Sequence, residues 1–218
     1  MKKLLTLGLA VAVICGFTVS ANAAFLSVSD MIGDNDGYGY GAGVVADGAT
    51  LPFTNDPTAG AGWNFDNRSA AEMAASDGSQ STDLQDNFDV TFFHSFDMSQ
   101  FSSLSSASFQ IDITGLQQGT FGGVSRLYFD GVEQLAFTTL PNQGAWGSGI
   151  FNFNVDLSML ADGMLDVYFD NWDPLGDDHI GIDYTQLNVR GTAVPEPMSM
   201  ALLGLGLVGM GLRRKLRG

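Results

Sequence analysis

The chain has 218 residues, and its 24 acidic residues outnumber nine basic ones, giving a formal net charge of −15 at pH 7. A chain this acidic is a poor partner for nucleic acid and for anionic lipid surfaces, because both carry the same sign of charge. The single cysteine, Cys15, lies near the start of the chain. Disulfides, thiol catalysis and cysteine-ligated metals are therefore excluded from the rest of the sequence.

The first 23 residues have the pattern of a secretory signal peptide. Two lysines open the chain, an apolar run covers residues 4–19, and small residues stand at Ala21 and Ala23. This order predicts that signal peptidase cleaves before Ala24. Cys15 then leaves with the signal peptide.

Residues 24–193 are predicted to form one secreted domain, because about 170 residues are enough for a single hydrophobic core. This segment contains three basic residues and 23 acidic ones, a net charge of −20, and it has no lysine. Divalent cations are plausible partners for such a charge. Solubility of a secreted protein is a sufficient alternative reason for the acidity.

The domain begins with a loosely alternating segment, residues 24–32, which predicts a first strand. A glycine-rich turn follows, in which Asp34 and Asp36 are close enough to bind one hard cation such as Ca²⁺ through oxygen. The turn is not an EF-hand, because Val45 stands where that motif requires glutamate. Ordinary turn formation explains the same residues without a metal.

One short helix is predicted, near residues 66–75. Ser69 and Glu72 have the spacing of a capping box, in which each residue's side chain bonds the other's backbone N–H. Asp77 and Gly78 then end the helix.

From Asp83 onward the apolar residues recur with a period of two, which indicates strands with one buried face. Asp130 and Gly131 lie between two of these segments and predict a tight hairpin. The sequence thus favours an all-β fold, a single antiparallel β-sandwich of jelly-roll-like type with an aromatic core. The predicted strands are residues 87–92, 108–113, 126–129, 132–138, 151–157, 164–169 and 180–189.

The densest polar cluster is the predicted loop at residues 170–179, which includes Trp172. Its carboxylates would repel one another unless they are solvated or bridged by a cation, so the loop is a second candidate calcium site. An exposed Trp172 is a candidate glycan contact. The alternative is a solvated loop with Trp172 packed beneath it. The candidate ligands here are Asp170, Asp173, Asp177 and Asp178.

No catalytic motif is present: there is no G-x-S-x-G elbow, no H-E-x-x-H pair and no phosphate-binding loop. His94 lies in a strand-like segment and is interpreted as structural. A pair of carboxylates for glycoside hydrolysis stays open, because their separation depends on the fold. The sequence predicts a protein that is not an enzyme.

The last 25 residues, 194–218, have three successive parts. Val194, Pro195, Glu196 and Pro197 form a stiff turn, because proline fixes φ and restricts the residue before it. Residues 198–212 carry no charge and, as a helix, would reach roughly 22 Å, somewhat short of a bilayer core. The basic cluster that follows would stay in the cytoplasm; it contains Arg213, Arg214 and Lys215.

These three parts, in this order, resemble the PEP-CTERM sorting signal of Gram-negative bacteria. The resemblance covers only the tail. It implies a hydrophobic sorting helix that is held transiently in the inner membrane, recognition by an exosortase-type processing protease, and transfer to the cell envelope surface or the extracellular matrix. It also implies an association with exopolysaccharide, which proteins bearing this signal often accompany.

The predicted function is that of an exported cell-surface or matrix protein with a structural, non-enzymatic role. The alternative is a calcium-stabilised carbohydrate-binding module associated with exopolysaccharide. A glycan-active hydrolase is a third hypothesis, and only the density of carboxylates motivates it.

Overall fold

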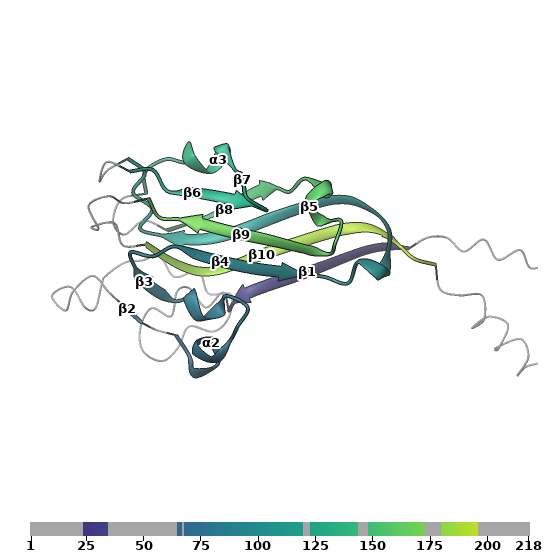
Figure 1. Cartoon of the computed structure of the whole chain (residues 1–218), viewed down its shortest axis with the longest axis horizontal. Helices are drawn as coiled ribbons and strands as arrows, with labels where there is room; N and C mark the ends of the chain where they lie inside the picture. Colours follow the sequence, from purple (N-terminus) through teal and green to yellow (C-terminus); the bar gives the residue numbers. More distant parts are fainter. Residues whose placement is uncertain are drawn as a thin grey trace, which may run out of the picture. The chain divides into compact units, whose positions relative to one another are not determined.

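Ten strands make up most of the part of the chain that the computed structural model describes, which is residues 24–34, 65–66, 68–119, 123–143, 148–172 and 180–195. They form two antiparallel sheets (Figure 1). The chain divides into the domain Phe25–Thr192 and a second unit, of which residue 24 and residues 193–195 are described.

The larger sheet has six strands and is built around the long strands β5 and β10. Its order is β2-β3-β10-β5-β8, and β1 also pairs with β10. β1 meets residues 184–192 of β10, whereas β3 meets residues 180–181. The strands are β1 (Phe25–Gly33), β2 (Phe65–Asp66), β3 (Leu84–Asp86), β5 (Phe101–Thr114), β8 (Ser148–Asn154) and β10 (Ile180–Ala193).

The smaller sheet has four strands in the order β4-β9-β6-β7. The predicted hairpin is confirmed: Asp130 and Gly131 have φ of 47° and 77°, the two positive values that a type I′ turn requires, and Phe129 pairs with Val132. The strands are β4 (Val90–Ser95), β6 (Arg126–Phe129), β7 (Val132–Glu133) and β9 (Met164–Asp170).

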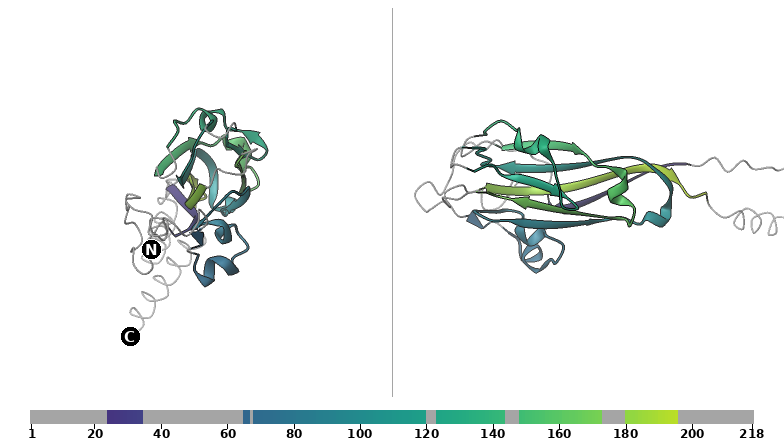
Figure 2. Two further views of the ribbon diagram at one scale, coloured as in Figure 1. Left: turned by 90° about the vertical axis from the view of Figure 1, so that its left-hand side faces the viewer. Right: turned by 45° about the horizontal axis from the view of Figure 1, so that its top comes forward.

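The core fills the space between the two sheets, which lie face to face as in a β-sandwich (Figure 2). Phe109 of β5 meets Phe129 of β6 edge to face, with ring centroids 5.1 Å apart. Phe129 in turn meets Phe153 of β8 at 6.4 Å. Each buried Phe contributes roughly 1.5–3 kcal/mol, so this aromatic core can hold the sheets together, as the sequence predicts.

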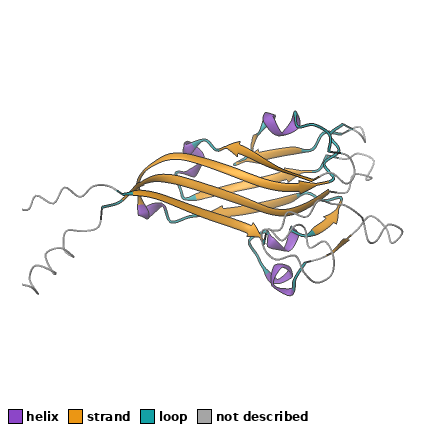
Figure 3. Ribbon diagram, turned by 180° about the vertical axis from the view of Figure 1, so that it is seen from behind, coloured by secondary structure: helices purple, strands orange, loops and turns teal. Residues whose placement is uncertain are grey.

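Two short α-helices and three 3-10 turns flank the strands in the described part of the chain (Figure 3). Helix α2 (Ala70–Ala74) begins with the predicted capping box: the Glu72 N–H donates to Ser69 Oγ, and the Ser69 N–H donates to Glu72 Oε2. Helix α3 (Leu135–Thr138) lies where a strand was predicted, so that prediction is wrong beyond Glu133. Burial of Phe137 between Phe153 and Phe169 accounts for the helix, because one helical turn places that ring in the core.

The beginning of β1 and the end of β10 lie together at one end of the domain (Figure 1). Phe25 pairs with Thr192, and the Ala193 N–H donates to the carbonyl oxygen of Ala24. The predicted cleavage position and the start of the sorting segment are therefore neighbours. Among the described residues, no helix is long and apolar enough to cross a membrane; the predicted sorting helix, residues 198–212, lies outside them.

Candidate metal centre at the junction of three strands

The candidate site lies where the partner of β10 changes from β1 to β3. Gly33 ends β1 with a φ of 92°, and its Cα lies so close to the backbone of β10 that an added Cβ would sit 2.3 Å from the Asp183 carbonyl oxygen. On the other side the Asp83 N–H donates to the carbonyl oxygen of Ile182. These backbone contacts bring Asp34, Asp83 and Asp183 to one place.

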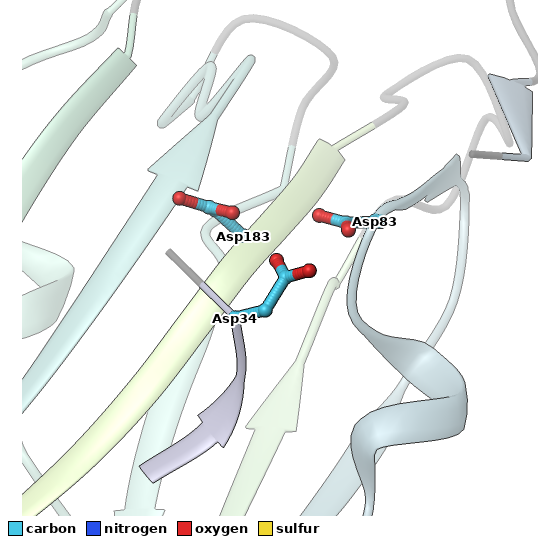
Figure 4. A group of neighbouring side chains, drawn as sticks. All are labelled: Asp34, Asp83 and Asp183. Carbon is cyan, nitrogen blue, oxygen red and sulfur yellow. The ribbon is translucent and has the colours of Figure 1, made fainter. Parts of the chain in front are cut away.

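The three carboxylates face one another (Figure 4). One oxygen from each lies within 4.8 Å of the oxygens of the other two. Asp83 and Asp183 are 1% and 2% exposed, and Asp34 is half-buried. Asp83 also has a φ of 53°, in the left-handed region that aspartate adopts more readily than most residues other than glycine.

This arrangement fits a hard divalent cation. Calcium binds carboxylate oxygens at 2.3–2.6 Å, so two ligands on opposite sides of one ion are about 5 Å apart. Three carboxylates this close, two of them buried, repel one another strongly unless they take up protons or share a cation. Three aspartates supply up to six of the six to eight oxygens that calcium takes, and backbone carbonyls or water complete such a shell.

Only one of the predicted ligands, Asp34, belongs to this group. Asp170 lies on β9 opposite Arg126, in the other sheet. Burial and the nearby Asp89 raise the pKa of Asp170, while Arg126 lowers it. The remaining predicted ligands, Asp36, Asp173, Asp177 and Asp178, lie outside the described residues.

Sequence reasoning missed Asp83 and Asp183. Asp83 lies outside both acidic clusters that the sequence singles out, and Asp183, five residues after the candidate ligand Asp178, interrupts the apolar run of a buried strand. A carboxylate in the middle of such a run was the available signal, because aspartate is almost never fully buried without a partner.

Trp172 is 54% exposed and follows the end of β9. The Arg126 guanidinium carbon lies 5.8 Å from the centroid of its ring, a cation–π contact. The indole is thus exposed at the surface, as its predicted role as a glycan contact requires; the loop residues 173–179 lie outside the described residues.

His94 belongs to a buried network between the sheets. Its Nδ1 lies 3.2 Å from Asp30 Oδ2 and its Nε2 lies 3.0 Å from Thr185 Oγ1. Burial of Asp30 opposes its ionisation, but hydrogen bonds from His94 and the Ser95 N–H outweigh it and lower its pKa. An Asp–His–Thr arrangement resembles a catalytic triad, yet His94 and Thr185 are both 0% exposed, so the structural interpretation of His94 fits better.

The sorting segment begins directly after β10. Val194 and Pro195 are exposed; the rest of the predicted sorting residues, Glu196, Pro197, Arg213, Arg214 and Lys215, lie outside the described residues, as do Ala21 and Ala23 of the predicted cleavage site.

Residues 193–215 match the model of the PEP-CTERM protein-sorting motif. The chain therefore carries this sorting motif at its C-terminus, as the sequence predicts. The motif indicates an exported protein that an exosortase processes in the membrane, and it implies localisation at the cell surface. No curated protein and no solved structure matches the chain.

Proposed function

We propose that this protein is an exported, non-enzymatic component of the cell surface or extracellular matrix. The observation that carries the proposal is the sorting motif at residues 193–215, which starts where the last strand of the domain ends. Signal peptidase would remove residues 1–23, and exosortase would process the tail after the domain has folded outside the inner membrane. The domain would then be the only part that remains at its destination.

A comparison of two bacterial strains tests this proposal. The full gene is expressed in a host that has its own exosortase and in a derivative that lacks it, and antiserum against the domain follows the product. We expect a shorter form outside the cell in the first strain and a longer, membrane-bound form in the second. Protein of one size in the cytoplasm of both strains would overturn the proposal.

We further propose that calcium stabilises the domain through Asp34, Asp83 and Asp183. Support comes from the convergence of three carboxylates from separate segments, two of them buried, within 4.8 Å. A cation that binds only the folded state stabilises it by about 2.7 kcal/mol at a hundredfold excess over its dissociation constant. For a domain of this size that corresponds to a rise of about 5–10 °C in the unfolding midpoint.

Thermal unfolding of the purified protein in calcium, in chelator and in sodium at equal ionic strength tests this second proposal. Asp183→Asn should lose the calcium-dependent rise in midpoint. Asp166→Asn, which makes the same charge change on the exposed face of β9, should keep it. A midpoint that does not respond to calcium in the unaltered protein would refute the site.

Carbohydrate binding is the alternative function, and the exposed indole of Trp172 supports it. A glycan-active hydrolase is the third hypothesis, and only the density of carboxylates motivates it.

A further inference from the structure

The outer face of the four-stranded sheet carries a group of aromatic side chains, which we call the aromatic face: Phe93, Tyr128, Tyr168 and Trp172. The strands alternate strictly here, so every second residue points away from the core. Phe93 is 47% exposed, Tyr168 is 38% exposed, and Trp172 is 54% exposed. Exposed aromatic groups gathered on one face of a soluble domain mark an interaction surface.

The register of the strands places these rings side by side. Tyr168 of β9 lies between Thr91 of β4 and Tyr128 of β6, and the two tyrosine ring centroids are 5.8 Å apart. Phe93 lies one step along the same face, opposite Asp166. At the other end, Arg126 pairs with Asp170, and its guanidinium lies over one face of the Trp172 ring, which stays 54% exposed.

Polar groups surround the rings and hold them in place. The Tyr168 hydroxyl donates to Asp89 Oδ2 at 3.2 Å, and the Arg126 Nε lies 3.8 Å from Glu133 Oε1. Phe93, Tyr128 and Tyr168 therefore stand on paired strands, and Trp172 lies against Arg126 just after β9, so a ligand meets a surface that needs little ordering on binding. Carboxylate oxygens accept hydrogen bonds, which suits a partner rich in hydroxyl donors.

The charge of this face limits the classes of partner that it can bind. Its only basic group among the described residues is Arg126, and it is outnumbered by four carboxylates: Asp89, Glu133, Asp166 and Asp170. A polyanionic chain, a phosphate-rich lipid surface and a second copy of the same face would all be repelled. An uncharged partner that combines apolar C–H surfaces with hydroxyl groups would not be repelled.

We propose that the aromatic face binds a neutral polysaccharide, with sugar rings stacked on Tyr168 and Trp172 and sugar hydroxyls donating to the surrounding carboxylates. The inference rests on the proposed function, because such a polymer is met outside the cell. The exported domain would thus bind a specific class of partner. The binding surface is separate from the aspartate cluster, which lies at the β1–β10–β3 junction of the other sheet.

Affinity electrophoresis of the full chain tests the proposal. The protein is purified in a polyoxyethylene detergent, which contains no sugar, and is run in native gels that contain a neutral glucan, mannan or galactan, or alginate as an anionic control. We expect retardation by at least one neutral polymer and none by alginate. Tyr168→Ala and Trp172→Ala should each raise the dissociation constant roughly fivefold or more, the effect of losing a central aromatic contact.

Phe25→Ala is the matched control. It removes a ring that is 70% exposed, but from β1 in the other sheet, so binding should be unchanged. The inference would be overturned if Phe25→Ala weakened binding equally, if alginate alone retarded the protein, or if no neutral polymer did so. It would also be overturned if the protein formed a concentration-dependent dimer that Tyr168→Ala abolishes. Because the assay uses purified protein, a failure here is distinct from a failure of export or processing.

Discussion

Asp112 provides a test of the electrostatics of the larger sheet. It lies near the end of β5, opposite Ile150 of β8, and it is only partly exposed. Burial raises its pKa from the ordinary 3.8 to about 6. Tyr184 of β10 has a pKa raised to about 12, by burial first and then by the charges of Asp112 and Asp183. At pH 7 the folded state therefore holds a charged aspartate whose ionisation is less favourable in the fold than in the unfolded chain.

The sign of the effect follows from the direction of the shift. Between pH 3.8 and about 6 the folded protein keeps a proton on Asp112 that the unfolded chain releases, so the free energy of unfolding falls as pH rises through this range. Each pKa unit corresponds to 1.36 kcal/mol, so the full shift gives about 3 kcal/mol. Because the carboxylate keeps some contact with water, we expect about 1–2 kcal/mol.

Asp112→Asn should therefore stabilise the protein by about 1–2 kcal/mol at pH 8 and by much less at pH 4. Urea unfolding in the presence of chelator measures this difference, and at pH 8 the midpoint should rise by about 0.5–1 M. Asp166→Asn, a charge-matched change at an exposed position of β9, is the control for the loss of one negative charge. The reasoning would be refuted if the free energies of unfolding of Asp112→Asn and the unaltered protein differed by the same amount from pH 4 to pH 8. It would also be refuted if the substitution lowered stability at pH 8.

Three further predictions concern packing and backbone geometry. Gly33→Ala should disrupt the strand junction, because its Cβ would lie 2.3 Å from the Asp183 carbonyl oxygen. The Cβ of Gly131→Ala meets nothing within 4 Å, so that variant should lose only about 1–2 kcal/mol of stability, the cost of its positive φ. Similar thermal midpoints for the two variants would contradict this prediction. Ser69→Ala should cost about 1 kcal/mol through loss of the helix cap, measured by chemical denaturation, with an unchanged midpoint as the contrary result. Phe129→Ala, at a side chain with 0% exposure, should cost about 3–5 kcal/mol, and a cost below about 1 kcal/mol would show that the two sheets do not rely on this ring.

Local patterns were sufficient to predict most of the strands and the α2 cap. The alternation at residues 164–169 and 180–189 corresponds to β9 and β10, and the hairpin turn depends on two neighbouring residues. The first half of β5, residues 101–107, was not predicted, because its serine-rich sequence does not alternate and its exposed positions come in pairs. The jelly-roll-like topology stays a prediction.

The candidate metal centre shows why a sequence pattern predicts only part of a site. Asp34 stands in a recognisable acidic turn, but its partners arrive through pairing of β10 with both β1 and β3, between segments far apart in the chain. The length of β10 separates the candidate metal centre from the start of the sorting motif. Asp183 and Ala193 are ten residues apart on one strand, which is about 33 Å at the usual rise per residue. Processing of the motif by exosortase would therefore leave the aspartates in place, and a cation bound by them would stabilise the domain both before and after processing.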